Sequence, residues 1–274
     1  MRRDRNPLLT VYAWLVYGFL FAPIVVLILF SFNDSKRNFI WRGFTLKWYP
    51  TLFANDALLN ALVVTLEVAL IAVVITTILG TLLGLGLARL RSGAAGSVSD
   101  TMIILPMVAP EVVIGISLLI FFALLFDAHG SVLQISIAHV AFSISYVAII
   151  VRARALSLDP RMEEAARDLG ASALGAFWHV TVPLLAPAVG AGAMIAFALS
   201  FDDLIITSFN AGVGSSTLPL YIYSRIRFGV TPEINAISTI VVAVTALLLL
   251  IGWRVGVIRA GARRSRPTPA AGIV

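Results

Sequence analysis

The sequence predicts an all-α integral membrane protein with six transmembrane helices, and three observations support this prediction. Of its 274 residues, 59% are hydrophobic and only 12% are charged, about half the ~25% charged fraction of ordinary soluble domains. The mean hydropathy is +0.98. The few charges fall in short clusters between long uncharged runs, which is the distribution that a hydrocarbon solvent requires.

Six apolar segments are long enough to cross about 30 Å of hydrocarbon as helices. Strands of a β-barrel would instead appear as alternating segments of about ten residues. The first segment follows a cluster of arginines, as a signal peptide does, but it is longer than the roughly 7 to 15 apolar residues of a secretory core, so we expect a retained span. The expected spans are residues 11–32, 59–88, 102–126, 132–151, 184–208 and 234–257.

The segments outside the six expected spans should lie alternately on the two sides of the membrane. Of the 20 basic residues, 14 lie in the segments on one side and 6 in those on the other. The richer set includes both ends of the chain, so the positive-inside rule predicts that both termini are cytoplasmic. The expected organisation is a cytoplasmic N-terminus over residues 1–10, a six-span domain over residues 11–262 and a disordered cytoplasmic tail over residues 263–274. The net charge is +6, but the basic residues flank apolar runs and form no stripe, so we expect no nucleic-acid partner.

Two features within the spans predict close packing and a broken backbone. Gly80 and Gly84 form a pair of small residues that would let another helix approach closely. Pro106 and Pro110 near the start of the third span should disturb its backbone. Membranes tolerate such a break mainly where protein or a watery cavity covers it.

Residues 157–183, called the elbow below, connect the fourth and fifth spans and include the most polar stretch of the chain. Asp159 suits an N-cap, Pro160 suits a first helical turn, and Gly170 suits the left-handed residue that ends a helix. These signals predict a short helix over residues 160–169.

A second short helix should begin at Ser172 and lead back to the membrane at Pro183. Glu163 and Arg167 are four residues apart with the acid first, a pairing that stabilises the first helix by at most about 0.5 kcal/mol. One interpretation of the elbow is a contact surface for a partner. The other is an amphipathic connector that only spaces two spans.

The elbow resembles the EAA loop of ABC importer permeases, which reads EAA, three residues, G, nine residues and I-x-L-P. All spacings match. Val180 and Val182 stand for the isoleucine and leucine of that pattern and keep their branched apolar character. The other matching residues are Glu164, Ala165, Ala166, Gly170 and Pro183.

The resemblance implies a type I ABC importer permease fold in which the elbow is a cytoplasmic coupling helix that docks on a partner ATPase. The only lysines are Lys36 and Lys47, and neither stands in a G-K-[ST] phosphate loop. ATP and magnesium would therefore bind the partner ATPase, and this chain would bind no cofactor and would not be an enzyme. The expected coupling residues are Glu163, Glu164, Ala165, Ala166, Gly170 and Pro183.

Other catalytic chemistry has little support in the sequence. There are no cysteines, which excludes disulfides, thiolate metal sites and cysteine nucleophiles. His129, His139 and His179 are scattered without a metal-ligand spacing. We interpret them as hydrogen-bonding residues and predict no metal site and no catalytic residues.

Four carboxylates lie inside apolar runs, where burying each costs about 2.5 to 3.5 kcal/mol. They are Glu67, Glu111, Asp202 and Asp203. For the two aspartates, one interpretation is that they guide a cation. The other is that they pair with Arg225 or Arg227, or cap a broken helix around Leu204. For the two glutamates a structural role near a membrane interface is favoured.

The surroundings of the aspartate pair are similar to permeases of the spermidine/putrescine importers. The likeness runs from Phe201 through Thr217, Leu218, Pro219 and residues 231–239, and upstream through Asn33, Trp48 and Pro110. By this resemblance Asp202, Asp203 and Glu111 would form an acidic wall. Tyr221 and Tyr223 would be aromatic partners for the ammonium groups of a polyamine.

The same resemblance implies the assembly. A second permease would complete a heterodimer in a bacterial inner membrane, two ATPase subunits would bind below it, and an extracytoplasmic solute-binding protein would deliver the polyamine. Alternatives are a permease for another small solute, such as ferric iron or an organic acid, and an ion-coupled secondary carrier. An intramembrane enzyme is disfavoured because no Ser/His/Asp constellation is evident.

Overall fold

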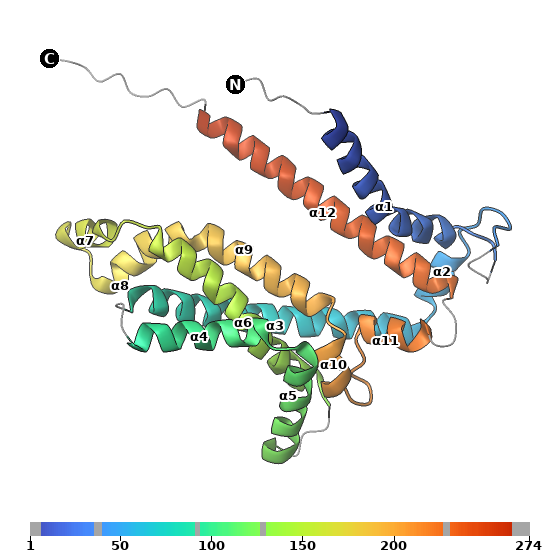
Figure 1. The fold of residues 1–274 in the computed structure, drawn as a ribbon, viewed down its shortest axis with the longest axis horizontal. Coiled ribbons are helices and arrows are strands. Elements are labelled where there is room, and N and C mark those ends of the chain that lie inside the picture. The colour runs from blue at the N-terminus through green and yellow to red at the C-terminus, as the bar shows by residue number, and fades with distance from the viewer. Residues whose placement is uncertain (1–6, 36–39, 91–93, 127–129, 227–230, 265–274) are drawn as a thin grey trace. The chain divides into compact units, whose positions relative to one another are not determined.

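The computed structural model describes residues 7–35, 40–90, 94–126, 130–226 and 231–264. Throughout these ranges the regular structure is helical, with a single isolated β-bridge between Asn33 and Phe44. The predicted all-α class is therefore confirmed. The chain forms two compact units, residues 1–56 with 225–274 and residues 57–224, and each is described by itself (Figure 1).

The first unit contains α1 (Pro7–Ser31), α2 (Trp48–Phe53) and α12 (Pro232–Arg264). α12 contacts both α1 and α2. α1 is apolar on all sides and only Ser31 of it is buried, as expected for a helix that faces lipid or another membrane protein.

A buried asparagine holds the loop that follows α1. The Asn33 side chain donates to the carbonyl of Ile40 at 2.8 Å and accepts from the backbone N–H of Arg42 at 2.9 Å. The indole N–H of Trp48 donates to the backbone carbonyl of Asn33 at 2.7 Å. Asn33 and Trp48 are thus brought together as structural residues, and Asp34 forms an exposed ion pair with Lys47 beside them.

The second unit is built around α6, which packs along α9 and also contacts α4, α5 and α10. A core cluster of Leu85, Val147, Val151, Leu185 and Ala196 joins α3, α6 and α9. The helices of this unit are α3 (Asp56–Arg89), α4 (Ala94–Val108), α5 (Glu111–Phe126), α6 (Val132–Leu156), α7 (Arg161–Asp168), α8 (Ala173–Ala176), a π-helix (Phe177–Thr181), α9 (Val182–Phe201), α10 (Ile205–Asn210) and α11 (Leu218–Ile226).

The predicted close helix approach is confirmed at both glycines of α3. A Cβ atom added to Gly80 would lie 2.7 Å from the Cβ atom of Val147 on α6. One added to Gly84 would collide with the backbone carbonyl of Ala148. Larger residues at either position would push α3 and α6 apart.

Two of the expected spans are broken. The third span divides into α4 and α5 at Ala109 and Pro110. Its two parts are bent by 104°, so that α5 turns sharply away from α4 (Figure 1). The fifth span divides into α9 and α10 across residues 202–204. The proline signal predicted the first break, while the second was only one of the alternatives for the aspartates.

The number of spans is confirmed only in part. Over the described residues, four helices are long and apolar enough to cross a membrane: α1, α3, α6 and the continuous helix formed by α8, the π-helix and α9. The bent pair α4 and α5 makes five if it counts as one span, and α12 qualifies only as a shorter apolar helix over Pro232–Leu247. Residues 1–6 and 265–274, which carry most of the predicted cytoplasmic termini, lie outside the described residues.

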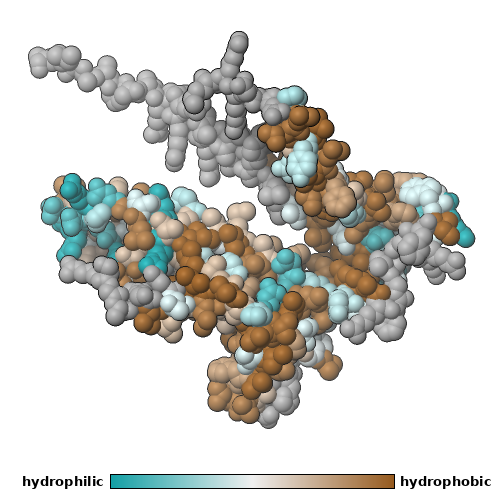
Figure 2. All heavy atoms as spheres, viewed as in Figure 1, coloured by the Kyte–Doolittle hydropathy of each residue, from teal (hydrophilic) through white to brown (hydrophobic). Residues whose placement is uncertain are grey.

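Polar and apolar surfaces of the second unit are well separated. Hydrophobic residues cover its long helices, whereas hydrophilic residues gather at the end that carries α7 and α8 (Figure 2). This is the pattern expected when the helices lie in lipid and the elbow lies in water.

Candidate functional site

The two helix breaks of the second unit meet at an acidic pocket. The pocket has a volume of about 310 Å³, at the lower end of the range for small-molecule sites, roughly 300 to 1,000 Å³. It brings three of the four predicted carboxylates together. Its lining residues are Glu111, Phe142, Leu199, Asp202, Asp203, Leu204 and Ile205.

Asp203 is engaged in holding the second break together. Its carboxylate accepts from the backbone N–H groups of Ile206 at 3.2 Å and Thr207 at 2.8 Å, and from the Thr207 hydroxyl at 2.8 Å. The side chain is only 7% exposed. Asp203 therefore caps α10, as one of the two sequence interpretations proposed.

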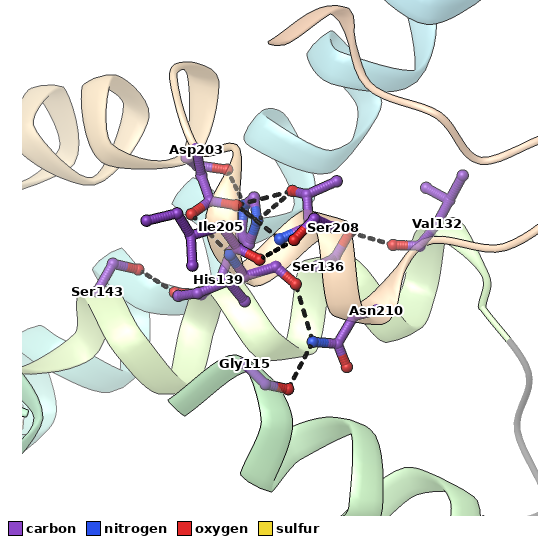
Figure 3. Close-up of polar contacts among 12 residues, drawn as sticks. Gly115, Val132, Ser136, His139, Ser143, Asp203, Ile205, Ser208 and Asn210 are labelled. Atoms are coloured by element: carbon purple, nitrogen blue, oxygen red, sulfur yellow. Dashed lines mark hydrogen bonds and ion pairs between the residues drawn. The ribbon is translucent and has the colours of Figure 1, made fainter. Parts of the chain in front are cut away.

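His139 of α6 completes this arrangement (Figure 3). Its Nε2 lies 3.2 Å from the Asp203 carboxylate and 3.1 Å from the Thr207 hydroxyl, and its Nδ1 lies 2.7 Å from the Ser200 hydroxyl. The ring thus links α6 to both sides of the α9–α10 break. Its interpretation as a hydrogen-bonding residue is confirmed, and no cluster of potential metal ligands occurs in the described part of the chain.

The polar contacts continue along α6 to neighbouring helices. Ser143 donates to the backbone carbonyl of His139 at 2.6 Å, and its hydroxyl lies 3.1 Å from that of Thr76 on α3. Asn210 donates to the carbonyl of Gly115 on α5 at 3.2 Å. Buried polar groups that are partnered in this way fix the relative positions of α3, α5, α6, α9 and α10.

Asp202 and Glu111 differ from Asp203 in their side-chain contacts and exposure. Neither makes a hydrogen bond or ion pair with another side chain among the described residues, and both are exposed on the pocket. α9 ends one residue before Asp202, and α4 ends three residues before Glu111. Asp202 therefore follows the C-terminal end of α9, which carries a partial negative charge, whereas Glu111 begins α5 and lies at the partially positive end of that helix.

The remaining predicted pathway residues lie outside the pocket lining. Tyr221 and Tyr223 lie on α11, half-buried and exposed respectively, so their role toward ammonium groups stays a prediction. Glu67 is exposed on α3. The aromatic residue at the pocket is the buried Phe142, whose ring lies 5.4 Å from that of Tyr146.

The elbow folds as its helix signals predicted. The Asp159 carboxylate accepts from the backbone N–H of Arg161 at the start of α7, and Gly170 after its end has a φ of +91°, which a residue with a Cβ rarely adopts. Ser172 caps α8 through the backbone N–H of Gly175 at 3.1 Å. α8 then continues through the π-helix into α9, with Pro183 in the first turn.

The predicted coupling residues of the elbow occupy two faces of α7. Glu164 and Ala165 are exposed, whereas Glu163 and Ala166 are partly buried. Glu163 forms an ion pair with Arg89 of α3 at 2.7 Å; its expected neighbour Arg167 instead lines an open depression beside Glu164. Leu169 next to Gly170 is 90% exposed.

Residues 77–257 match the family described as binding-protein-dependent transport system inner membrane component. The chain belongs to this family. The permease is 39% identical over 254 residues to the putrescine transport system permease protein PotI of Escherichia coli (strain K12), covering 91% of this chain and 90% of that protein.

Two further relatives have the same subunit type. The permease is 38% identical over 235 residues to the spermidine/putrescine transport system permease protein PotC of Escherichia coli (strain K12), with 86% and 88% of the two chains covered. It is 36% identical over 240 residues to PotC of Haemophilus influenzae, with 88% and 93% covered. Relatives of this kind are transport subunits, so the permease is not itself an enzyme.

A solved structure has the same fold. The permease superposes on a chain of a bacterial ABC transporter involved in the import of the acidic polysaccharide alginate, with a TM-score of 0.68 and 16% identity. The match covers 92% of this chain and 96% of that chain. The helical arrangement is therefore that of an ABC importer permease.

Several residues of the site were not predicted from the sequence. Phe142 and Ser200 each look like ordinary residues of an apolar run. A signal was nevertheless present, because Ser136, His139 and Ser143 recur at intervals of three and four residues. Such spacing places polar side chains on one stripe of an otherwise apolar helix.

Proposed function

We propose that this chain is a permease subunit of an ATP-driven polyamine importer in a bacterial inner membrane. The observation that carries the proposal is the acidic pocket at the meeting point of two broken spans, where Asp202 and Glu111 are exposed and have no side-chain partner among the described residues. The relatives PotI and PotC, permeases of putrescine and spermidine/putrescine transport systems, support the same substrate class.

The chemistry of the pocket suits a slender organic cation. Two carboxylates could each face one ammonium group of putrescine, while apolar side chains of Phe142, Leu199 and Ile205 contact the methylene chain. Cation–π attraction to an aromatic ring adds only about 0.5 to 2 kcal/mol. Weak attraction suits a pathway, because a solute that binds tightly leaves slowly.

In a six-span type I importer arrangement with both termini in the cytoplasm, the elbow would lie on the ATPase side. Glu164, Ala165 and the exposed Leu169 of the elbow would contact the ATPase, and Gly170 would set the bend. The 90% exposed side chain of Leu169 supports this assignment, because it offers a partner apolar surface to bury next to the polar helix α7.

The complete importer would contain this chain, a second permease, two ATPase subunits that bind ATP and magnesium, and an extracytoplasmic solute-binding protein. A solved structure of the alginate importer includes a periplasmic protein, which supports the last of these partners. Asp203, Tyr221 and Tyr223 would shape the pathway without being its main cation contacts.

The substrate class is tested by uptake into proteoliposomes that contain the permease and its partners. Labelled putrescine or spermidine should enter when ATP is supplied, and unlabelled polyamines should compete. Entry of ferric iron or an organic anion, with no competition by polyamines, would replace the proposed substrate. Uptake driven by an ion gradient without the ATPase would instead indicate a secondary carrier.

A further inference from the structure

One carboxylate oxygen of the elbow joins three helices. Oε1 of Glu163 on α7 accepts from an Nη atom of Arg89 at 2.7 Å and from the hydroxyl of Thr181 at 2.5 Å. Arg89 is the last residue of α3, and Thr181 is the last residue of the π-helix that leads into α9. These three residues are called the clamp below.

The clamp spans a weak point in the backbone. A π-turn has one residue more than an α-turn and commonly marks a functional site. In this chain the π-helix lies between α8 and α9. Without another connection, a displacement of α7 and α8 could deform the π-helix and leave α9 in place. Thr181 is only 6% exposed and immediately precedes α9. Its hydrogen bond to Glu163 therefore connects α7 directly to the start of α9.

A second arginine anchors the same region to α6. Arg154 near the end of α6 donates through Nε to the carbonyl of Leu184 at 3.2 Å, and through Nη1 to the hydroxyl of Ser157 at 3.4 Å. The first turn of α9 is therefore tied to α6 by Arg154 and to α3 and α7 by the clamp. A movement of α7 along this route would shift α9, which ends at the acidic pocket.

We propose that Glu163 is a positioning residue that transmits movement of α7 to α3 and α9, whereas its exposed neighbours form the contact with the ATPase. The inference rests on the proposed function, because it takes an ATPase as the source of the movement. It assigns adjacent glutamates different tasks: Glu164 faces the partner and Glu163 faces the membrane helices.

The absence of cysteine from the natural chain makes a rescue experiment possible. In the Glu163→Cys/Thr181→Cys variant, loss of the clamp should lower polyamine uptake per ATP hydrolysed by about two- to five-fold, the effect expected from an exposed ion pair. Joining the two cysteines with a short bifunctional thiol reagent should restore the ratio to that of the natural protein. A joined protein that stays uncoupled while ATP hydrolysis continues would overturn the proposal.

Three further variants, Glu163→Gln, Glu163→Ala and Asp34→Asn, test whether the charge and the location of the clamp matter for coupling. Glu163→Gln keeps an acceptor for Thr181 but loses the charge, so its uptake per ATP should fall between those of the natural protein and Glu163→Ala. Asp34→Asn removes the charge from another surface ion pair, that with Lys47 in the first unit, and should leave the ratio unchanged. An equal loss in Asp34→Asn, or an unchanged ratio in Glu163→Ala, would contradict the role of the clamp.

A readout without transported solute distinguishes this inference from the proposed function. A Met194→Cys reporter on the exposed side of α9 should change its labelling rate when the assembled complex binds ATP, and Glu163→Ala should remove most of that change. If polyamine uptake fails while the reporter responds in this way, the substrate is wrong and the clamp stands. If the reporter responds equally with and without Glu163, the clamp is wrong.

Discussion

Asp202 and Asp203 are adjacent in the chain but have different surroundings, because they lie in the break between the end of α9 at Phe201 and the start of α10 at Ile205. The Asp203 carboxylate is turned inward to the backbone of α10 and to His139, while that of Asp202 stays on the open side of the pocket. The structure therefore separates a structural carboxylate from one that is available to a solute.

The first prediction concerns the available carboxylates. Asp202→Asn and Glu111→Gln each remove one negative charge, so the KM for putrescine uptake should rise about five-fold or more, as expected for losing roughly 1 kcal/mol of attraction in a hydrated site. Initial uptake rates over a range of putrescine concentrations measure this effect. Glu67→Gln, on an exposed part of α3 outside the pocket, is the matched control. An unchanged KM in the double variant Asp202→Asn/Glu111→Gln would argue against a cation path here.

The second prediction concerns Asp203. Asp203→Ala removes the cap of α10 and one of the two partners of His139 Nε2, so the permease should lose about 2 kcal/mol of stability or more. Asp203→Asn retains one acceptor and should lose less. Thermal unfolding of the purified protein in detergent measures both, with Asp202→Ala as control; a larger loss in that control would reverse the assignment.

At the scale of single elements, the sequence predicted the helices and the Pro110 break more fully than the site. Long apolar runs and local cap signals specify helices directly, which explains the agreement for α1, α3, α6 and the elbow. The break after Phe201 has no proline and depends on contacts between Asp203, His139 and Thr207. Those residues are as many as 68 positions apart, so only the tertiary structure reveals their pairing.

The third prediction tests the contact between α3 and α6. Gly84→Ala places a methyl group against the backbone of Ala148, and overpacking of this kind typically costs about 1 to 3 kcal/mol. Gly86→Ala lies on the same helix with no atom within 4 Å of the added Cβ, so it should be neutral or slightly stabilising. Unfolding of the two variants in parallel measures the difference, and equal stability would contradict the close approach.

The fourth prediction tests the exposed side of the elbow. Leu169→Asp should weaken association with the ATPase roughly ten-fold, because a charge replaces an apolar anchor worth more than about 1 kcal/mol. Val213→Asp, at a fully exposed valine outside the elbow, is the control. Quantitative co-purification of the ATPase measures binding; retention of the ATPase by Leu169→Asp would move the contact elsewhere.

At the scale of the whole molecule, the family and the fold agree with the sequence interpretation, since residues 77–257 match a family of inner membrane transport components. The family match leaves the transported substrate and the source of energy to be established separately. The acidic pocket bears on the substrate, and the elbow bears on the energy source. Each can fail independently, because their residues lie on different helices.

Whether this chain belongs to an ATP-driven importer is tested by the energy dependence of accumulation. In proteoliposomes with the complete set of partners, putrescine should accumulate against its gradient only when ATP is hydrolysed, and Leu169→Asp should lower accumulation together with ATPase binding. Accumulation by the isolated chain, driven by an ion gradient and indifferent to ATP, would contradict the account.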